Sequence, residues 1–152
     1  MFVALVPHSA FTGDLNNNPY NFKAYNLNFI AAYIDGEQFP SIAYTPNFAN
    51  KHYIREFYSL FETLNQLSTE SVLDFDREDY PNGNVIYGFN FSPDNSDDCS
   101  KSGYVNTIKR GSLGLQLKFA QALTETINVI VYCEFDNMVE IDAPRNAITD
   151  YI

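Results

Sequence analysis

The sequence predicts an all-β fold, a β-sandwich of two antiparallel sheets with one short α-helix in a connection. Residues 113–119 and 127–135 carry most of this prediction, because apolar and other side chains alternate along them with a period of two. The composition agrees, since 13 Phe and 11 Tyr are typical of pleated, half-buried surfaces. A sheet with an apolar face has to be covered, and in a chain with so little helical pattern the expected cover is a second sheet.

Each of these two segments is expected to bury one face of a strand. The faces expected to be buried are Leu113, Leu115, Leu117 and Phe119 in the first segment and Ile127, Val129, Val131, Cys133 and Phe135 in the second. We therefore expect the substitution Val131→Asp to unfold the protein, because an unpaired buried charge outweighs the stability of a fold of this size.

The N-terminal part of the chain predicts two more strands and a hairpin. Residues 2–6 form an apolar run with the length of a buried strand, and the Asn-rich residues 12–20 have the composition of a loop. Residues 27–35 are strand-like and lead into Asp35-Gly36, which is a strong signal for a tight hairpin turn. The chain from Glu37 to Pro40 is expected to follow that turn.

One segment has the period of a helix instead. Apolar residues recur at steps of three and four between Asn50 and Leu64, and Asn50 is placed to act as the N-cap. The favoured interpretation is an amphipathic helix that plugs one end of the sandwich. The alternative is a role in binding a groove on a partner.

The remaining segments complete the series of elements. Residues 74–79 are acidic and lead into residues 80–84, where Pro and Asn-Gly set a turn. Further strands are expected at 85–91, 104–109 and 138–142, with an exposed loop at 92–103. The total is six to eight strands and one helix without an internal repeat or a linker, so residues 1–152 are expected to form a single domain.

Composition and charge narrow the classes of function. A formal net charge of −10 argues against a surface that follows a phosphate backbone, so direct nucleic-acid binding is not expected. Residues 1–6 lack the basic leader and the length of a signal peptide, and no apolar run has the length of a membrane span. Cys99 and Cys133 are expected to be free thiols, which fits a reducing, intracellular compartment.

Candidate catalytic residues are few. Nucleophilic catalysis needs a Ser, Cys or Thr beside a base that a third group orients. The two histidines stand in no such frame, since His8 follows Pro7 in an expected turn and His52 lies at the start of the helical pattern. Ordinary turn or surface roles are expected for both, and we predict no catalytic residue and no enzymatic activity.

Two acidic groups are candidate cation sites. They are Asp74, Asp76, Glu78 and Asp79 in one loop, and Asp94, Asp97 and Asp98 in another. Both lack the glycine and the terminal glutamate that a helix-flanked calcium loop requires. No Cys/His group has zinc spacing, and no Gly-rich stretch has the pattern of a phosphate cradle. Solvated loops are therefore expected, with no metal and no cofactor site.

A series of phrases along the chain resembles the C-terminal half of the double-jelly-roll major capsid proteins of Polinton (Maverick) elements and related, adintovirus-like DNA viruses. The phrases are Asn18–Phe22, Leu27–Ile30, Tyr33–Glu37, Tyr53–Arg55, Ser59–Phe61, Asp76–Pro81, Ile108–Gly111, Leu115–Ala120 and Ile127–Tyr132. The most specific is Glu134–Asn137 leading to Glu140–Asp142, Arg145-Asn146 and Asp150-Tyr151. They occur in order over nearly the whole chain.

The resemblance implies a jelly-roll β-sandwich with a structural role in a virion. Proteins of that family stack two jelly rolls per chain, form trimers and tile an icosahedral shell, and each roll has two facing four-stranded sheets. It implies self-association into a trimer or a higher capsomer, contacts with other capsid proteins, a virion location, and no catalysis.

The chain also departs from the family pattern. The upstream jelly roll and the first strand of the second roll are not found before Met1. If one sheet lacks a strand, its exposed edge is expected to recruit a strand from a neighbour or to promote association. A transposon-derived fragment retained by a host genome, with a new binding role, would look the same.

Two other classes of function stay open beside the capsid hypothesis. A jelly roll can also be a binding module for carbohydrate or peptide, since lectins use the same sandwich. An enzyme would require a pocket in which an acid, His8 or His52 is buried with an altered pKa.

Overall fold

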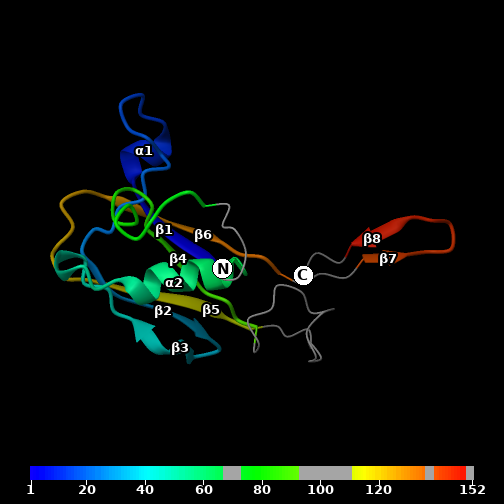
Figure 1. Cartoon of the computed structure of the whole chain (residues 1–152). Coiled ribbons are helices and arrows are strands. Elements are labelled where there is room, and N and C mark those ends of the chain that lie inside the picture. The colour runs from blue at the N-terminus through cyan, green and yellow to red at the C-terminus, as the bar shows by residue number, and fades with distance from the viewer. Residues whose placement is uncertain (67–72, 93–110, 136–138, 150–152) are drawn as a thin grey trace.

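Two three-stranded antiparallel sheets face each other in the computed structural model (Figure 1), which describes residues 1–66, 73–92, 111–135 and 139–149. The first sheet has the order β4-β1-β6 and the second the order β3-β2-β5. Their bounds are β1 Phe2–Pro7, β4 Ile86–Gly88 and β6 Ile127–Tyr132, and β2 Leu27–Ile34, β3 Glu37–Tyr44 and β5 Leu113–Phe119. The predicted all-β sandwich of two antiparallel sheets is confirmed.

The other elements are short. They are α1 His8–Thr12, the 3₁₀ helix η1 Phe48–Asn50, α2 Ile54–Thr63, and the strands β7 Val139–Ile141 and β8 Ala147–Thr149. Strands β7 and β8 pair with each other in a separate two-stranded sheet, which Figure 1 shows beside the sandwich rather than in either layer. The sequence did not predict α1 or β8, because runs of three to five residues carry almost no periodic signal.

The core is a single apolar cluster between the two sheets. Its fully or almost fully buried members are Val3, Leu5, Leu27, Ile30, Ala32, Tyr44, Tyr53, Leu60, Tyr80, Val85, Tyr87 and Phe89. Strand β1 is the middle strand of its sheet, and residues 3–6 are buried on both of its faces. This explains why its sequence is an unbroken apolar run instead of an alternating one.

The turn between β2 and β3 forms where the sequence predicts it. Asp35 and Gly36 both have positive φ, 52° and 87°, which is the conformation of a two-residue type I′ hairpin. The Asp35 carboxylate also accepts a hydrogen bond from the backbone N–H of Ser112 at 2.8 Å. The turn is therefore tied to the residue that precedes β5.

Helix α2 begins later than the sequence suggests, so the prediction of Asn50 as its N-cap is wrong. Asn50 ends η1, which is capped by the Asn47 side chain, and Lys51 then adopts a left-handed conformation with φ 57°. A residue in that conformation cannot continue into a helix, so α2 starts only at Ile54. It ends at Thr63 with Leu64 as its C-cap, and Asn65 follows with a φ of 52°, the left-handed conformation that commonly terminates a helix.

Helix α2 closes the side of the sandwich between β4 and β3, so the expected amphipathic helix does cover the core, but along one side of the sandwich and not at one end. Its apolar face packs on the core through Tyr53, Leu60 and the aromatic rings of Phe57 and Phe61. A side chain at Gly88 in β4 would place its Cβ 2.8 Å from the Ser59 carbonyl, so only glycine allows this close approach. Figure 1 shows α2 lying along the two layers.

Several expected strands differ in length from the structure or lie outside the part it describes. The strand expected at 85–91 is reduced to Ile86–Gly88, although Val85, Tyr87 and Phe89 are fully buried as its pattern predicts. The strand expected over 127–135 ends at Tyr132, and the one expected at 138–142 is observed as β7. The short strand predicted at 104–109 and nearly all of the loop at 92–103 lie outside the described residues.

Two buried tyrosines allow a test of the core. The Tyr80 hydroxyl donates a hydrogen bond to the Ile86 carbonyl at 2.8 Å, whereas the buried Tyr87 hydroxyl has no partner. We expect Tyr80→Phe to lower the free energy of unfolding by about 1 kcal/mol, and Tyr87→Phe to leave it unchanged or raise it by up to about 1 kcal/mol. Urea unfolding of the two variants measures both effects. Equal destabilisation by both substitutions would contradict this core.

Candidate functional site

The side of the sandwich opposite α2 is flanked by β6 and β5, the last strands of their sheets. The two strands follow each other in the sequence, and their connection at residues 120–126 joins the two layers. Within the described ranges, no helix packs across the gap between these strands as α2 does on the other side. We call this region, formed by β6 and β5, the open side.

Apolar side chains of the open side are partly in solvent. Val129 and Val131 in β6 are 43% and 45% exposed, and Leu113 in β5 is 45% exposed. The expectation that Leu113, Val129 and Val131 are buried is therefore wrong, and so is the same expectation for Phe135, which is 80% exposed. The period of two in the sequence gives the face of the strand but does not show whether another layer reaches it.

Strand register shows that Val131 nevertheless points toward the inside of the sandwich. Val131 pairs with Val3 on β1, and Val3 pairs with Tyr87 on β4. Directly opposed residues of an antiparallel pair point to the same face, and both Val3 and Tyr87 are fully buried. Val131 thus faces the core but is not covered by any of the described elements.

Along β6, the backbone N–H and C=O groups of successive residues point alternately toward β1 and away from it. The N–H of His8 donates to the Thr126 carbonyl at 2.9 Å, so His8 and Thr126 are a hydrogen-bonded pair. In an antiparallel pair such pairs recur at every second residue along the two strands. Asn128, Ile130 and Tyr132 therefore bond to β1, whereas the N–H and C=O groups of Ile127, Val129 and Val131 point away from it. The outward groups belong to the same residues whose side chains face inward.

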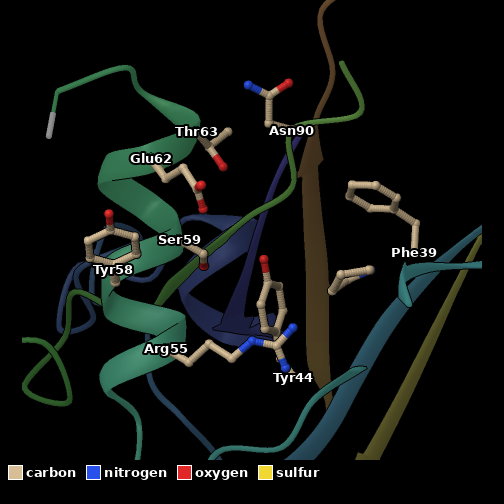
Figure 2. Close-up of a pocket in the computed structure, with 9 residues that line it drawn as sticks. Phe39, Tyr44, Arg55, Tyr58, Ser59, Glu62, Thr63 and Asn90 are labelled. Atoms are coloured by element: carbon tan, nitrogen blue, oxygen red, sulfur yellow. The ribbon is translucent and has the colours of Figure 1, made fainter. Parts of the chain in front are cut away.

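A pocket of about 310 Å³ lies on the closed side, between α2 and β3 (Figure 2). Its lining residues are Phe39, Pro40, Tyr44, Arg55, Tyr58, Ser59, Glu62, Thr63 and Asn90. Aromatic rings and polar groups share the wall, and Figure 2 shows Arg55 reaching from α2 toward Tyr44. Neither His8 nor His52 lines this pocket.

Most hydrogen bonds of the pocket residues go to the backbone. Arg55 donates to the carbonyls of Ile42 and Ala43 at 2.7 and 3.0 Å, and its guanidinium lies 4.9 Å from the centre of the Tyr44 ring. The Tyr44 hydroxyl donates to the Gly88 carbonyl at 3.1 Å. These contacts hold α2, β3 and β4 together, so Arg55 and Tyr44 have a structural role at this pocket.

Glu56 is a buried acid that sequence reasoning missed. It lies on the inner face of α2 and is only 3% exposed. Burial raises the pKa of its carboxyl, while a backbone hydrogen bond and the nearby Arg55 oppose that change. It does not line the pocket. Its position one turn after Tyr53 in the apolar stripe was the signal that could have found it.

The two histidines lie apart from each other and from the pocket. His8 is exposed at the start of α1, with its Nδ1 3.1 Å from the Asn128 side-chain oxygen. His52 is also exposed and bonds through its backbone to Asn47. Among the described residues, neither imidazole forms a hydrogen bond with a Ser, Thr or Cys side chain, and both histidines are exposed.

Two of the acidic residues at 74–79 use their carboxylates in bonds to other protein groups. Asp76 accepts hydrogen bonds from the backbone N–H groups of Glu78 and Asp79, and Glu78 forms an exposed ion pair with Lys51 at 2.7 Å. No group of three or more metal-ligating side chains occurs in the described part of the chain. The second acidic group, Asp94, Asp97 and Asp98, lies outside that part.

One of the two cysteines lies in the described part of the chain. Cys133 is a partly buried free thiol, as expected, and Cys99 lies outside the described residues. Among the helices that the structure describes, none combines the length and apolarity needed to cross a membrane.

Comparison with known proteins gives one match. A Caenorhabditis elegans protein, named as uncharacterized protein F54H12.2, is 27% identical over 158 aligned residues. The match covers 100% of this chain and 36% of the C. elegans protein, so the chain spans about a third of its relative. No protein-family model matches the sequence, and no solved structure matches the fold.

The different exposure of two paired valines leads to a first prediction for this site. We expect Val3→Asp, at a fully buried position, to cost more than about 4 kcal/mol and abolish cooperative folding. We expect Val131→Asp, at the open side, to cost about 1–2 kcal/mol and leave a folded protein, contrary to what the sequence alone suggests. Thermal unfolding followed by circular dichroism distinguishes the two. Loss of folding in both variants would mean that the open side is covered.

Glu56 leads to a prediction for pH. Because burial raises its pKa, the folded state binds the proton more tightly than the unfolded state, so stability falls as pH rises above about 4, the usual glutamate range. We expect Glu56→Gln to remove the part of this decrease in stability that comes from ionisation of Glu56. Urea unfolding midpoints over a pH series measure it, and Glu37→Gln, at an exposed position on β3, is the matched control. An unchanged pH profile in Glu56→Gln would contradict the assignment.

Proposed function

We propose that this chain is a jelly-roll domain of a capsid protein and acts as a structural unit through protein–protein contacts. The observation that carries the proposal is the open side, where Val129 and Val131 face the core but are partly exposed, and where the outer backbone groups of β6 pair with no other strand of the described residues. Such an edge is suited to contact with another polypeptide.

The sequence phrases that resemble the Polinton-type capsid proteins support this proposal independently. They run through β6 of the first sheet, β2 and β5 of the second, and α2, the helix that closes one side. The described sheets have three strands each, whereas a complete jelly roll has four in each sheet. Under the proposal, neighbouring protein supplies what the open side lacks. The partners would be further copies of the chain and other capsid proteins, and the location would be the virion.

The pocket between α2 and β3 favours a second candidate function. Phe39 and Tyr58 give it aromatic surface, and Glu62 and Asn90 give it polar groups, a combination suited to a sugar ring or a short peptide. Under this alternative the sandwich is a carbohydrate- or peptide-binding module. The pocket belongs to the closed side and needs no assembly.

Assembly distinguishes the two candidates. We expect multi-angle light scattering of the purified protein to show species of three or more chains, and electron microscopy to show regular capsomers or closed particles in the heaviest fractions. A protein that forms no species above a dimer at any concentration would contradict the capsid proposal.

A glycan array is the complementary measurement. Selective binding that Tyr58→Ala abolishes would favour the second candidate, because Tyr58 lines the pocket but is 52% exposed and its loss leaves the core intact. The capsid proposal predicts an array without selective binding.

A further inference from the structure

We propose that the edge of β6 with which no other described strand pairs forms an antiparallel pair with β6 of a second copy of this chain, so that the β4-β1-β6 sheets of the two copies join into one six-stranded sheet. This inference rests on the proposed function, because it names the contact through which copies associate. The outward N–H and C=O groups of Ile127, Val129 and Val131 would form the bonds.

The charge distribution favours a second copy at this edge. The chain has a net charge of −10, so two copies repel each other over most of their surface. Strand β6, with the sequence Ile-Asn-Val-Ile-Val-Tyr, carries no charged side chain. Two copies can therefore approach along β6 without placing like charges opposite each other.

The register of β6 is self-complementary. Consider a twofold axis that is perpendicular to the sheet and passes midway between the Ile130 residues of the two copies. It places Val129 of one copy opposite Val131 of the other, and Asn128 opposite Tyr132. Both valines point their side chains inward and their backbone groups outward. The same pairing therefore satisfies the free backbone groups and covers apolar surface that is 43% and 45% exposed in one copy.

The other edge strand of the open side is less suited to pairing. Strand β5 contains Lys118, and lysine on an edge strand opposes association with another strand. It also contains Gly114, which has no side chain to pack against a neighbour. Strand β6 has neither feature and is rich in Val and Ile, the residues that favour strand pairing.

Sedimentation equilibrium over a dilution series tests the inference. We expect the wild-type protein to contain a reversible dimer, alone or as the unit of larger species, and Val131→Lys to raise its dissociation constant at least tenfold. Gln116→Lys makes the same change of charge on the exposed face of β5 and is expected to leave that constant unchanged. If Val131→Lys does not fold by circular dichroism, Val131→Thr, which keeps the β-branched shape, takes its place with the same direction of effect.

The outcomes separate this inference from the proposed function. Species of three or more chains that Val131→Lys leaves unchanged would overturn the β6 contact and keep the capsid proposal. A dimer that Val131→Lys dissociates, without any larger species, would support the β6 contact and overturn the capsid proposal. A wild-type protein that stays monomeric at every concentration would overturn the β6 contact.

Discussion

Packing of α2 against the side of the sandwich between β4 and β3 is the contact on which the rest of the structure depends. Two small sheets bury a core only if at least one of their sides is closed, and α2 closes it with aromatic rings and with the bonds of Arg55 to the carbonyls of β3. The glycine at position 88 and the left-handed Lys51 and Asn65 set where the helix lies and how long it is. Burial of Glu56 shows how close the fit is, since a carboxyl is held out of water there.

The opposite side determines what the protein can do. The sheets end at β6 and β5, and core-facing valines meet solvent because no described element takes the position that α2 occupies on the other side. In a sandwich with one closed and one open side, only the open side has strand edges suited to contact with another chain. Both the capsid hypothesis and the β6 contact depend on this asymmetry.

Sequence periodicity predicted the strand faces well and their surroundings poorly. It identified β1, β2, β5, β6 and the Asp35-Gly36 turn, because alternation and turn chemistry are local properties. It assigned Val131 to the buried interior because a period of two cannot report whether an opposing layer extends that far. It placed Asn50 as the helix cap because asparagine favours caps, whereas the left-handed Lys51 interrupts the chain before α2. The open side could only be found by combining strand order with exposure.

Residue-resolved amide hydrogen exchange by NMR, in protein dilute enough to be monomeric, tests the open side most directly. We expect slow exchange for the amides of Asn128 and Ile130, which bond to β1, and fast exchange for those of Val129 and Val131, which point outward. Uniformly slow exchange along β6 in the monomer would contradict the account, because it would mean that another segment of the same chain already pairs with this edge.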